Sequence, residues 1–323
     1  MLASSILSPV PLHIPDGFLN TPVAVVGWLL TTLLIGCALQ QTRAQLGERQ
    51  VPLMGILAAF IFAAQMLNFP VAGGTSGHML GGALAAIILG PWAAVLIMTC
   101  VIAVQALLFQ DGGLLVMGWN ILNMGVFTAF SGYFVYKGVI RLLGANRRAV
   151  LVAGLAGAWL SVMVGAVATA VELAVSGASP LGIVLPAMTG VHALIGVGEG
   201  LITVAALAFI AQTRPDMLQI GSQAPATRSA GWVWAGLIIA LMVTLFSPLA
   251  SPSPDGLERV AEDAGFIDQG MDPSYKILPD YTVPFIENEA VTTILAGAIG
   301  VLVVFAAAYG VARLRRGRKG MLA

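Results

Sequence analysis

Long apolar stretches separated by short polar segments run through nearly the whole chain. Eight of them are interpreted as membrane-spanning helices, because about 20 apolar residues cross a hydrocarbon core of roughly 30 Å. They are rich in Ala, Leu, Gly and Val, as expected for helices that pack closely in lipid. The predicted spans cover residues 22–40, 52–69, 92–109, 117–136, 149–175, 183–211, 232–246 and 290–311.

A further apolar segment, at residues 79–89, is too short to cross a membrane unaided. At a rise of about 1.5 Å per residue, such a helix reaches about half of the way across the hydrocarbon core. It follows the glycine-rich stretch PVAGGTSGHMLGG at 70–82, which does not suit a regular helix. Backbone that is not regularly helical occurs at membrane depth where it lines a protein-buried site. We therefore expect residues 73–82 to form one wall of a site, with Gly77 allowing close backbone approach.

Composition supports this interpretation. Hydrophobic residues make up 58% of the chain and charged residues 9%, with a mean hydropathy of +0.93, whereas soluble domains carry roughly 25% charged residues. The predicted fold class is an all-α polytopic membrane protein. A seven-helix bundle with one short helix is expected at 12–212, a cytoplasmic linker at 213–230, and a two-helix hairpin-like unit with an extracytoplasmic loop at 231–323.

The distribution of charge predicts the orientation. Thirteen of the fifteen Lys and Arg residues lie at 43–49, 137–148, 214–228 and 313–319. If the N-terminus is outside and the short helix counts as a crossing, all four segments are cytoplasmic, as the positive-inside rule requires. We predict a multi-pass protein of the cell (inner) membrane with its C-terminus in the cytoplasm. The insert 251–289, with nine acidic and two basic residues, is then expected to be a small exposed loop outside.

Two of the three histidines, His13 and His78, lie on the outer side in this arrangement. His13 begins the stretch HIPDGFL ahead of the first span, and His78 ends GGTSGH. A histidine at a membrane boundary is a candidate ligand for a borderline metal ion. The alternatives are an ordinary polar residue at a helix start for His13 and, for His78, a side chain satisfied by Thr75 or Ser76.

A free amine one residue before a histidine would favour the metal hypothesis. The amine, the intervening amide nitrogen and the imidazole form a planar chelate, which suits Ni²⁺ or Cu²⁺ and can hold low-spin Co²⁺. The imidazole of His78 would complete four coordination. This geometry requires the mature chain to begin at Leu12, whereas 11 residues precede Leu12 in the sequence as written.

Other polar residues in or beside the spans could support such ligands. Asn120 and Asn123 lie one turn apart and could cross-link helices or orient a ligand. His192 and Glu199, seven residues apart, share a helix face and fit either a structural hydrogen-bonded pair or a metal-site role. Glu172 is interpreted as an interfacial residue.

Four ordered motifs resemble those of the CbiM/NikM family. They are HIPDGFLNTP at 13–22, NFPVAGGTSGHMLGGALAAIILGP at 68–91, QALLFQDGGLLVMGWNILNMG at 105–125 and HALIGVGEGLIT at 192–203. This family comprises the metal-binding membrane (S) components of energy-coupling-factor (ECF) importers for cobalt and nickel. The similarity covers about residues 12–212. The second unit, with PDGLE at 254–258, resembles the small CbiN/NikN partner, here fused.

The resemblance implies a site built from the N-terminal amine, here that of Leu12, with His13 and His78. The family has its initiator methionine at the position of Leu12, so residues 1–11 are predicted to be a gene-model extension or a removed tail. The resemblance also implies Co²⁺ or Ni²⁺ as the transported ligand and no cofactor. The implied partners are ECF-type ATPase subunits and a CbiQ/NikQ-like transmembrane coupling subunit.

The sequence contains no G-x-x-x-x-G-K-[ST] and no H-E-x-x-H. We therefore predict that the chain is not an enzyme, that partner subunits hydrolyse ATP, and that it has no nucleic-acid partner. Two alternatives stay open: a secondary metal carrier with His192 and Glu199 as a proton relay, and an intramembrane enzyme with three histidines. The second is disfavoured because no further carboxylate or cysteine is expected near either loop. Nickel and cobalt are not separated, although a planar nitrogen-rich site favours Ni²⁺.

Overall fold

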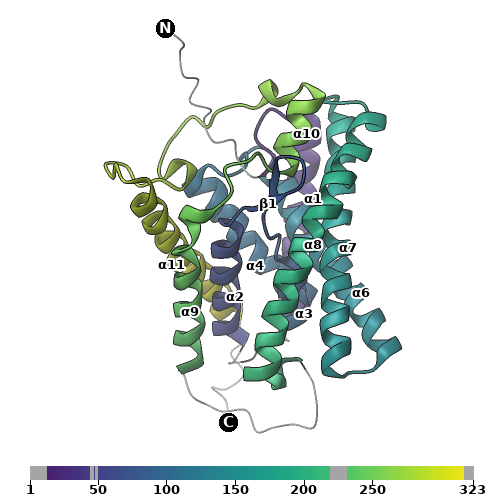
Figure 1. The fold of residues 1–323 in the computed structure, drawn as a ribbon, viewed down its shortest axis with the longest axis vertical. Helices are drawn as coiled ribbons and strands as arrows, with labels where there is room; N and C mark the ends of the chain where they lie inside the picture. The colour runs from purple at the N-terminus through teal and green to yellow at the C-terminus, as the bar shows by residue number, and fades with distance from the viewer. Residues whose placement is uncertain (1–12, 44–46, 48–49, 219–230, 316–323) are drawn as a thin grey trace.

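The computed structural model describes residues 13–43, 47, 50–218 and 231–315. The described part is predominantly helical (Figure 1), with seven helices long and apolar enough to cross a membrane. The predicted all-α polytopic membrane fold is confirmed. The spans are α1 (Thr21–Thr42), α4 (Pro91–Val104, extended by a π-helical turn to Phe109), α5 (Met117–Ile121) continuous with α6 (Thr128–Leu143), α7 (Arg147–Ser176), α8 (Leu181–Thr213), α9 (Gly231–Thr244) and α11 (Glu289–Arg315).

The glycine-rich wall lies between two shorter helices. The predicted span at 52–69 is present as α2 (Gln50–Gln65), which has 16 residues and is not among the seven helices long enough to cross a membrane. It ends four residues before the predicted 69, and the chain then forms an antiparallel hairpin of β1 (Phe69–Val71) and β2 (Thr75–Gly77). The expected short helix is present as α3 (Gly82–Leu89). An eight-residue helix is about 12 Å long, so α3 does not cross a bilayer alone.

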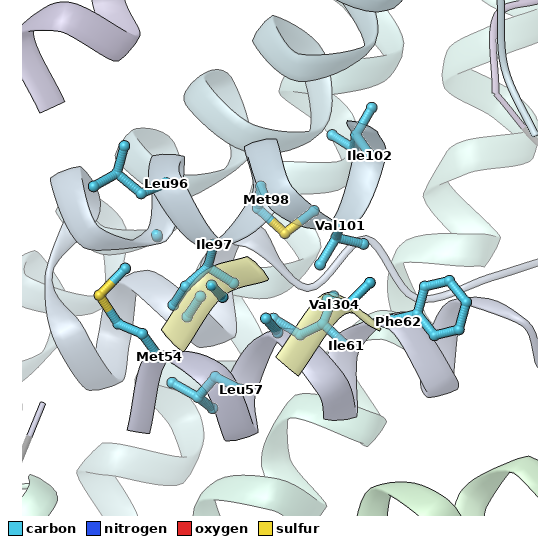
Figure 2. Packing of buried hydrophobic residues seen from close by; sticks show 14 of the residues in the cluster. Met54, Leu57, Ile61, Phe62, Leu96, Ile97, Met98, Val101, Ile102 and Val304 are labelled. Carbon is cyan, nitrogen blue, oxygen red and sulfur yellow. The ribbon is translucent and has the colours of Figure 1, made fainter. Parts of the chain in front are cut away.

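The main core lies where α2, α4 and α11 meet (Figure 2). Phe62 of α2, Ile97 and Val101 of α4, and Val304 of α11 are all buried there. Helix α9 also packs against α2. The second unit is therefore joined to the first through α2, since both of its long helices use that helix as a neighbour.

The acidic insert is not the small exposed loop that its composition predicts. It carries α10 (Gly256–Ala264), which lies across the end of α8 (Figure 1). Leu257, Val260 and Ala261 follow helical spacing and form one apolar face. This face is buried with Ile14 and Phe18 of the N-terminal segment. The expectation was wrong because a nine-residue amphipathic helix buries its face on another part of the chain, which charge counts do not reveal.

Candidate metal centre

The segment 13–19 is held in place by two polar side chains. The Asn120 carboxamide pairs with the backbone of Ile14: its Oδ1 accepts from Ile14 N–H (3.1 Å) and its Nδ2 donates to Ile14 O (3.0 Å). The Asp16 carboxylate accepts from three successive N–H groups at 114–116, at 2.9 to 3.2 Å. These contacts fix the backbone that follows His13, so the imidazole has a defined position.

His13 is buried, with 3% of its surface exposed. Its Nδ1 lies 2.8 Å from Asp111 Oδ1 and 3.2 Å from Asp111 O. The other ring nitrogen, Nε2, is also buried and has no hydrogen-bond partner within the described residues. Burial lowers the pKa of His13, but the Asp111 carboxylate outweighs this and raises the pKa above its ordinary value. Burial raises the pKa of Asp111, but His13 outweighs this and lowers it.

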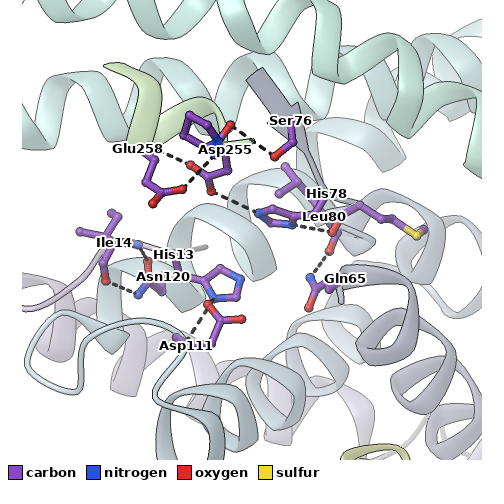
Figure 3. Close-up of polar contacts among 12 residues, drawn as sticks. His13, Ile14, Gln65, Ser76, His78, Leu80, Asp111, Asn120, Asp255 and Glu258 are labelled. Carbon is purple, nitrogen blue, oxygen red and sulfur yellow. Dashed lines mark hydrogen bonds and ion pairs between the residues drawn. The ribbon is translucent and has the colours of Figure 1, made fainter. Parts of the chain in front are cut away.

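His78 follows β2 and faces His13 across a short gap (Figure 3). The two ring centroids are 5.5 Å apart and the planes meet at 79°. His78 Nδ1 lies 3.1 Å from Met79 O, a contact that assigns the proton to Nδ1. His78 Nε2 lies 3.9 Å from Asp255 Oδ2. A proton held on Nδ1 leaves Nε2 as the ring nitrogen able to bind a cation.

The two imidazoles line one cavity of about 70 Å³. Asn120, Asn123 and His192 from the predicted supporting set line it too, together with Asp255 of the insert. Its remaining walls are mostly apolar, from α7, α8 and α10. A small cavity with few polar groups fits a single ion or a few waters better than an organic ligand.

The insert closes this cavity from the side of α10. Ser76 N donates to Pro254 O (2.8 Å) and Ser76 Oγ donates to Ser253 O (2.8 Å), so the insert adds to the β2 edge. Asp255 is the N-cap of α10, with Glu258 completing a capping box. Burial raises the pKa of the Asp255 carboxyl to about 7.

The remaining predicted residues lie near the site in structural roles. Thr75 Oγ1 donates to Ala72 O rather than to His78. A Cβ on Gly77 would lie 2.7 Å from the Ile195 side chain, which agrees with the expected close approach. Glu199 accepts from Leu80 N–H (2.7 Å) and Gly81 N–H (3.0 Å), and so anchors the loop that follows His78.

His192 and Glu199 are therefore engaged separately. His192 Nδ1 lies 2.8 Å from Met188 O, one turn earlier on α8. Glu172 is not interfacial as expected: it is 5% exposed and accepts from Asn123 Nδ2 at 2.8 Å. Asn123 thus links α7 to the helix that carries it, which matches the cross-linking interpretation.

Sequence reasoning missed two carboxylates beside the histidines, Asp111 and Asp255, and the expectation that no further carboxylate lies near either loop is wrong. A local signal was present. Asp-Gly occurs only three times in the chain, at 16–17, 111–112 and 255–256. Asp255 lines the cavity, Asp111 contacts His13, and Asp16 holds the segment that follows His13. Within the described residues, no three His, Cys, Asp or Glu side chains are arranged to hold a metal ion together. Leu12, the remaining predicted ligand, lies outside the described residues.

Comparisons with known proteins match both halves of the chain. Residues 13–217 match the family model CbiM, described as the cobalt uptake substrate-specific transmembrane region, and residues 230–317 match the PDGLE domain. A putative fused nickel transport protein, NikMN, of Archaeoglobus fulgidus is 36% identical over 94% of this chain and 99% of its own length. A fused nickel transport protein NikMN of Rhodobacter capsulatus is 29% identical over 91% of this chain and 95% of its own. The crystal structure of a truncated transition metal transporter aligns with a TM-score of 0.56 and 31% identity, covering 62% of this chain and 99% of that one.

Proposed function

Because the chain belongs to the CbiM family of cobalt uptake transmembrane proteins, with a PDGLE domain fused behind it, we propose that it captures Co²⁺ or Ni²⁺ for import through His13 and His78. It is a multi-pass membrane component of a metal transport system, and its relatives are named transport proteins rather than enzymes.

The observation that carries the proposal is the pair of buried imidazoles on one cavity. His13 Nδ1 contacts a carboxylate and His78 Nδ1 contacts a backbone carbonyl. The carbonyl contact orients the His78 imidazole to bind an ion through Nε2. The carboxylate contact holds the His13 ring in a defined position.

The full ligand set that we propose adds two nitrogens from the chain start, the amine of residue 12 and the amide of His13. It requires a mature chain that begins at Leu12. In a chelate with its own amide, the His13 ring binds through Nδ1, so the ion replaces Asp111 at that atom. The 2.8 Å contact with Asp111 then belongs to the ion-free protein, where it holds the imidazole near its binding position.

The proposed direction of transport follows from the charge pattern. With the N-terminus outside, the cavity lies on the outer side, and the Asp111 and Asp255 carboxylates attract cations to it. ECF-type ATPase subunits and a CbiQ/NikQ-like coupling subunit are the proposed partners that drive import. The secondary-carrier alternative loses support because Glu199 is held by two backbone N–H groups, which gives it a positioning role beside His78.

The test measures bound Ni²⁺ and Co²⁺ in protein purified from its own host, with the N-terminal residue identified by intact mass. His13→Ala and His78→Ala should each weaken binding by more than about a hundredfold while membrane insertion stays normal, because each removes a ligand and not a helix contact. Glu262→Gln, on the exposed side of α10, is the matched control and should bind as the parent does. Full metal content in both histidine variants contradicts the proposed site. A chain that binds tightly while retaining residues 1–11 contradicts the amine chelate alone.

A further inference from the structure

The insert brings a carboxylate against the histidine that the proposed function uses. We propose that Asp255 and His78 together form a loading site, where a divalent transition-metal ion binds before it reaches the ligands at His13. This inference rests on the proposed function and adds a residue of the PDGLE segment to the metal pathway. The loading site is defined here as Asp255 Oδ2 and His78 Nε2.

The distance between these two atoms suits one ion. Asp255 Oδ2 and His78 Nε2 lie 3.9 Å apart, whereas first-row divalent ions such as Zn²⁺ bind nitrogen and oxygen at about 2.0–2.2 Å. An ion between the two atoms would therefore contact both at ordinary bond lengths with little movement of either side chain. Waters would fill its other coordination positions.

Each of the two side chains is held so that the required atom faces its partner. Asp255 Oδ1 accepts from Glu258 N–H at 2.8 Å, which caps α10 and leaves Oδ2 on the side of His78 (Figure 3). His78 Nδ1 is engaged by Met79 O, which directs Nε2 towards Asp255. Both side chains are buried, at 3% and 7% exposure. A ligand pair fixed in this way needs little reorganisation to bind an ion.

The loading site opens onto the proposed final site. Asp255, His78 and His13 line the same cavity, and the two imidazole centroids are 5.5 Å apart. An ion held by His78 can thus pass from the carboxylate to the His13 side without leaving His78, which avoids full rehydration between steps.

The first experiment measures the association rate of Ni²⁺ with the full-length protein in detergent, by rapid mixing with Ni²⁺ alone. Asp255→Asn removes the charge and keeps the cap, because Asn is as good an N-cap as Asp. It should slow association about tenfold, the lower end of what a charged cavity contributes to a cation on-rate. Glu262→Gln removes a charge from the exposed face of the same helix and should change the rate less than twofold. Equal rates for the two variants overturn the inference.

A second experiment separates this inference from the proposed function. His13→Ala removes the final site and should leave weak Ni²⁺ binding at the loading site, which the double variant His13→Ala/Asp255→Asn abolishes. Identical binding by the single and double variants overturns the loading site and leaves the proposed function intact. Undiminished tight binding in His13→Ala contradicts the proposed function itself. Should Asp255→Asn assemble poorly, Asp255→Ser also keeps an N-cap and gives the same readout.

Discussion

The tripeptide Pro-Asp-Gly occurs twice in the chain, at 15–17 and at 254–256, and its two copies play different parts at the same site. In the first copy both oxygens of Asp16 accept from backbone N–H groups at 114–116. In the second copy, Asp255 Oδ1 caps its own helix and Oδ2 faces His78. Both oxygens of Asp16 accept hydrogen bonds from backbone N–H groups, whereas Asp255 has one oxygen directed at the His78 imidazole.

The glycines of the two copies differ as well. Gly17 has a φ of +98°, and a Cβ there would lie 2.0 Å from the backbone oxygen of Gln269. A Cβ on Gly256 would meet side chains instead, at 2.7 Å from Ile195 Cδ1 and 2.9 Å from His192 Cε1. The same three residues therefore form a rigid contact between backbone segments at 15–17 and a contact with movable side chains at 254–256.

The largest effect is expected for Gly17→Ala. Positive φ and a clash with a backbone atom act together, so the variant should lose about 4 kcal/mol of stability and its metal uptake. Gly256→Ala is the matched change and should cost about 1 kcal/mol, because the Ile195 side chain can shift. Thermal denaturation in detergent and uptake assays measure both. Equal losses at the two positions contradict the contrast between a rigid and an adjustable copy.

Glu199→Gln should have the next largest effect. The Glu199 carboxylate accepts from Leu80 N–H and Gly81 N–H as Asp16 does from 114–116, but it is fully buried. A carboxamide presents one acceptor and one donor, so one backbone N–H loses its partner at a cost of about 3 kcal/mol. The loop after His78 should loosen and Ni²⁺ binding should weaken, as equilibrium titration would measure. Unchanged affinity means that the loop is held by other contacts.

Asp16→Asn and Asp255→Asn test directly whether the two carboxylates have different roles. Asp16→Asn should cost about 2 kcal/mol, because a single amide oxygen replaces two charged acceptors for three N–H groups. Asp255→Asn should leave the denaturation midpoint nearly unchanged while slowing Ni²⁺ association. If Asp255→Asn destabilises the protein as much as Asp16→Asn, its carboxylate is structural and the two copies do not differ.

Tyr281→Phe should give the smallest effect. Its hydroxyl donates to Asp111 Oδ2 at 2.5 Å, while Asp111 Oδ1 keeps His13. Loss of this one donor should cost about 1 kcal/mol and change Ni²⁺ affinity only a few-fold. Denaturation midpoints and Ni²⁺ titration measure these values. A loss as large as that in His13→Ala would show that the second unit controls His13 through Tyr281.

The fold could be predicted where the signal is local. Apolar length correctly predicted seven of the eight spans and the short helix near 79–89, because it depends on neighbouring residues only. The end of α2 at Gln65 and the β-hairpin after it were missed, since that hairpin is fixed partly by Pro254, far along the chain, which accepts from Ser76 N–H.

Residue type alone pointed to the two histidines of the site, but not to the residues that contact them. His13 and His78 stand out because histidine is rare in this sequence, and the structure brings them together. Asp111 and Asp255 did not stand out, since a carboxylate in a polar loop is ordinary until its neighbour is known. Asp255 reaches His78 because α10 buries its apolar face against Ile14 and Phe18, a contact between segments far apart in the chain.

The packing of α9 and α11 against α2 has a consequence for the PDGLE segment. Both ends of the insert that carries Asp255 are fixed to the same helix in the membrane. At the proposed loading site the Asp255 carboxylate is therefore tethered to His78 within one chain, and its effective concentration there depends on the length of the insert. Because the two units are fused, Asp255 and His78 meet in a first-order step within one molecule, whereas two separate chains would meet in a second-order step.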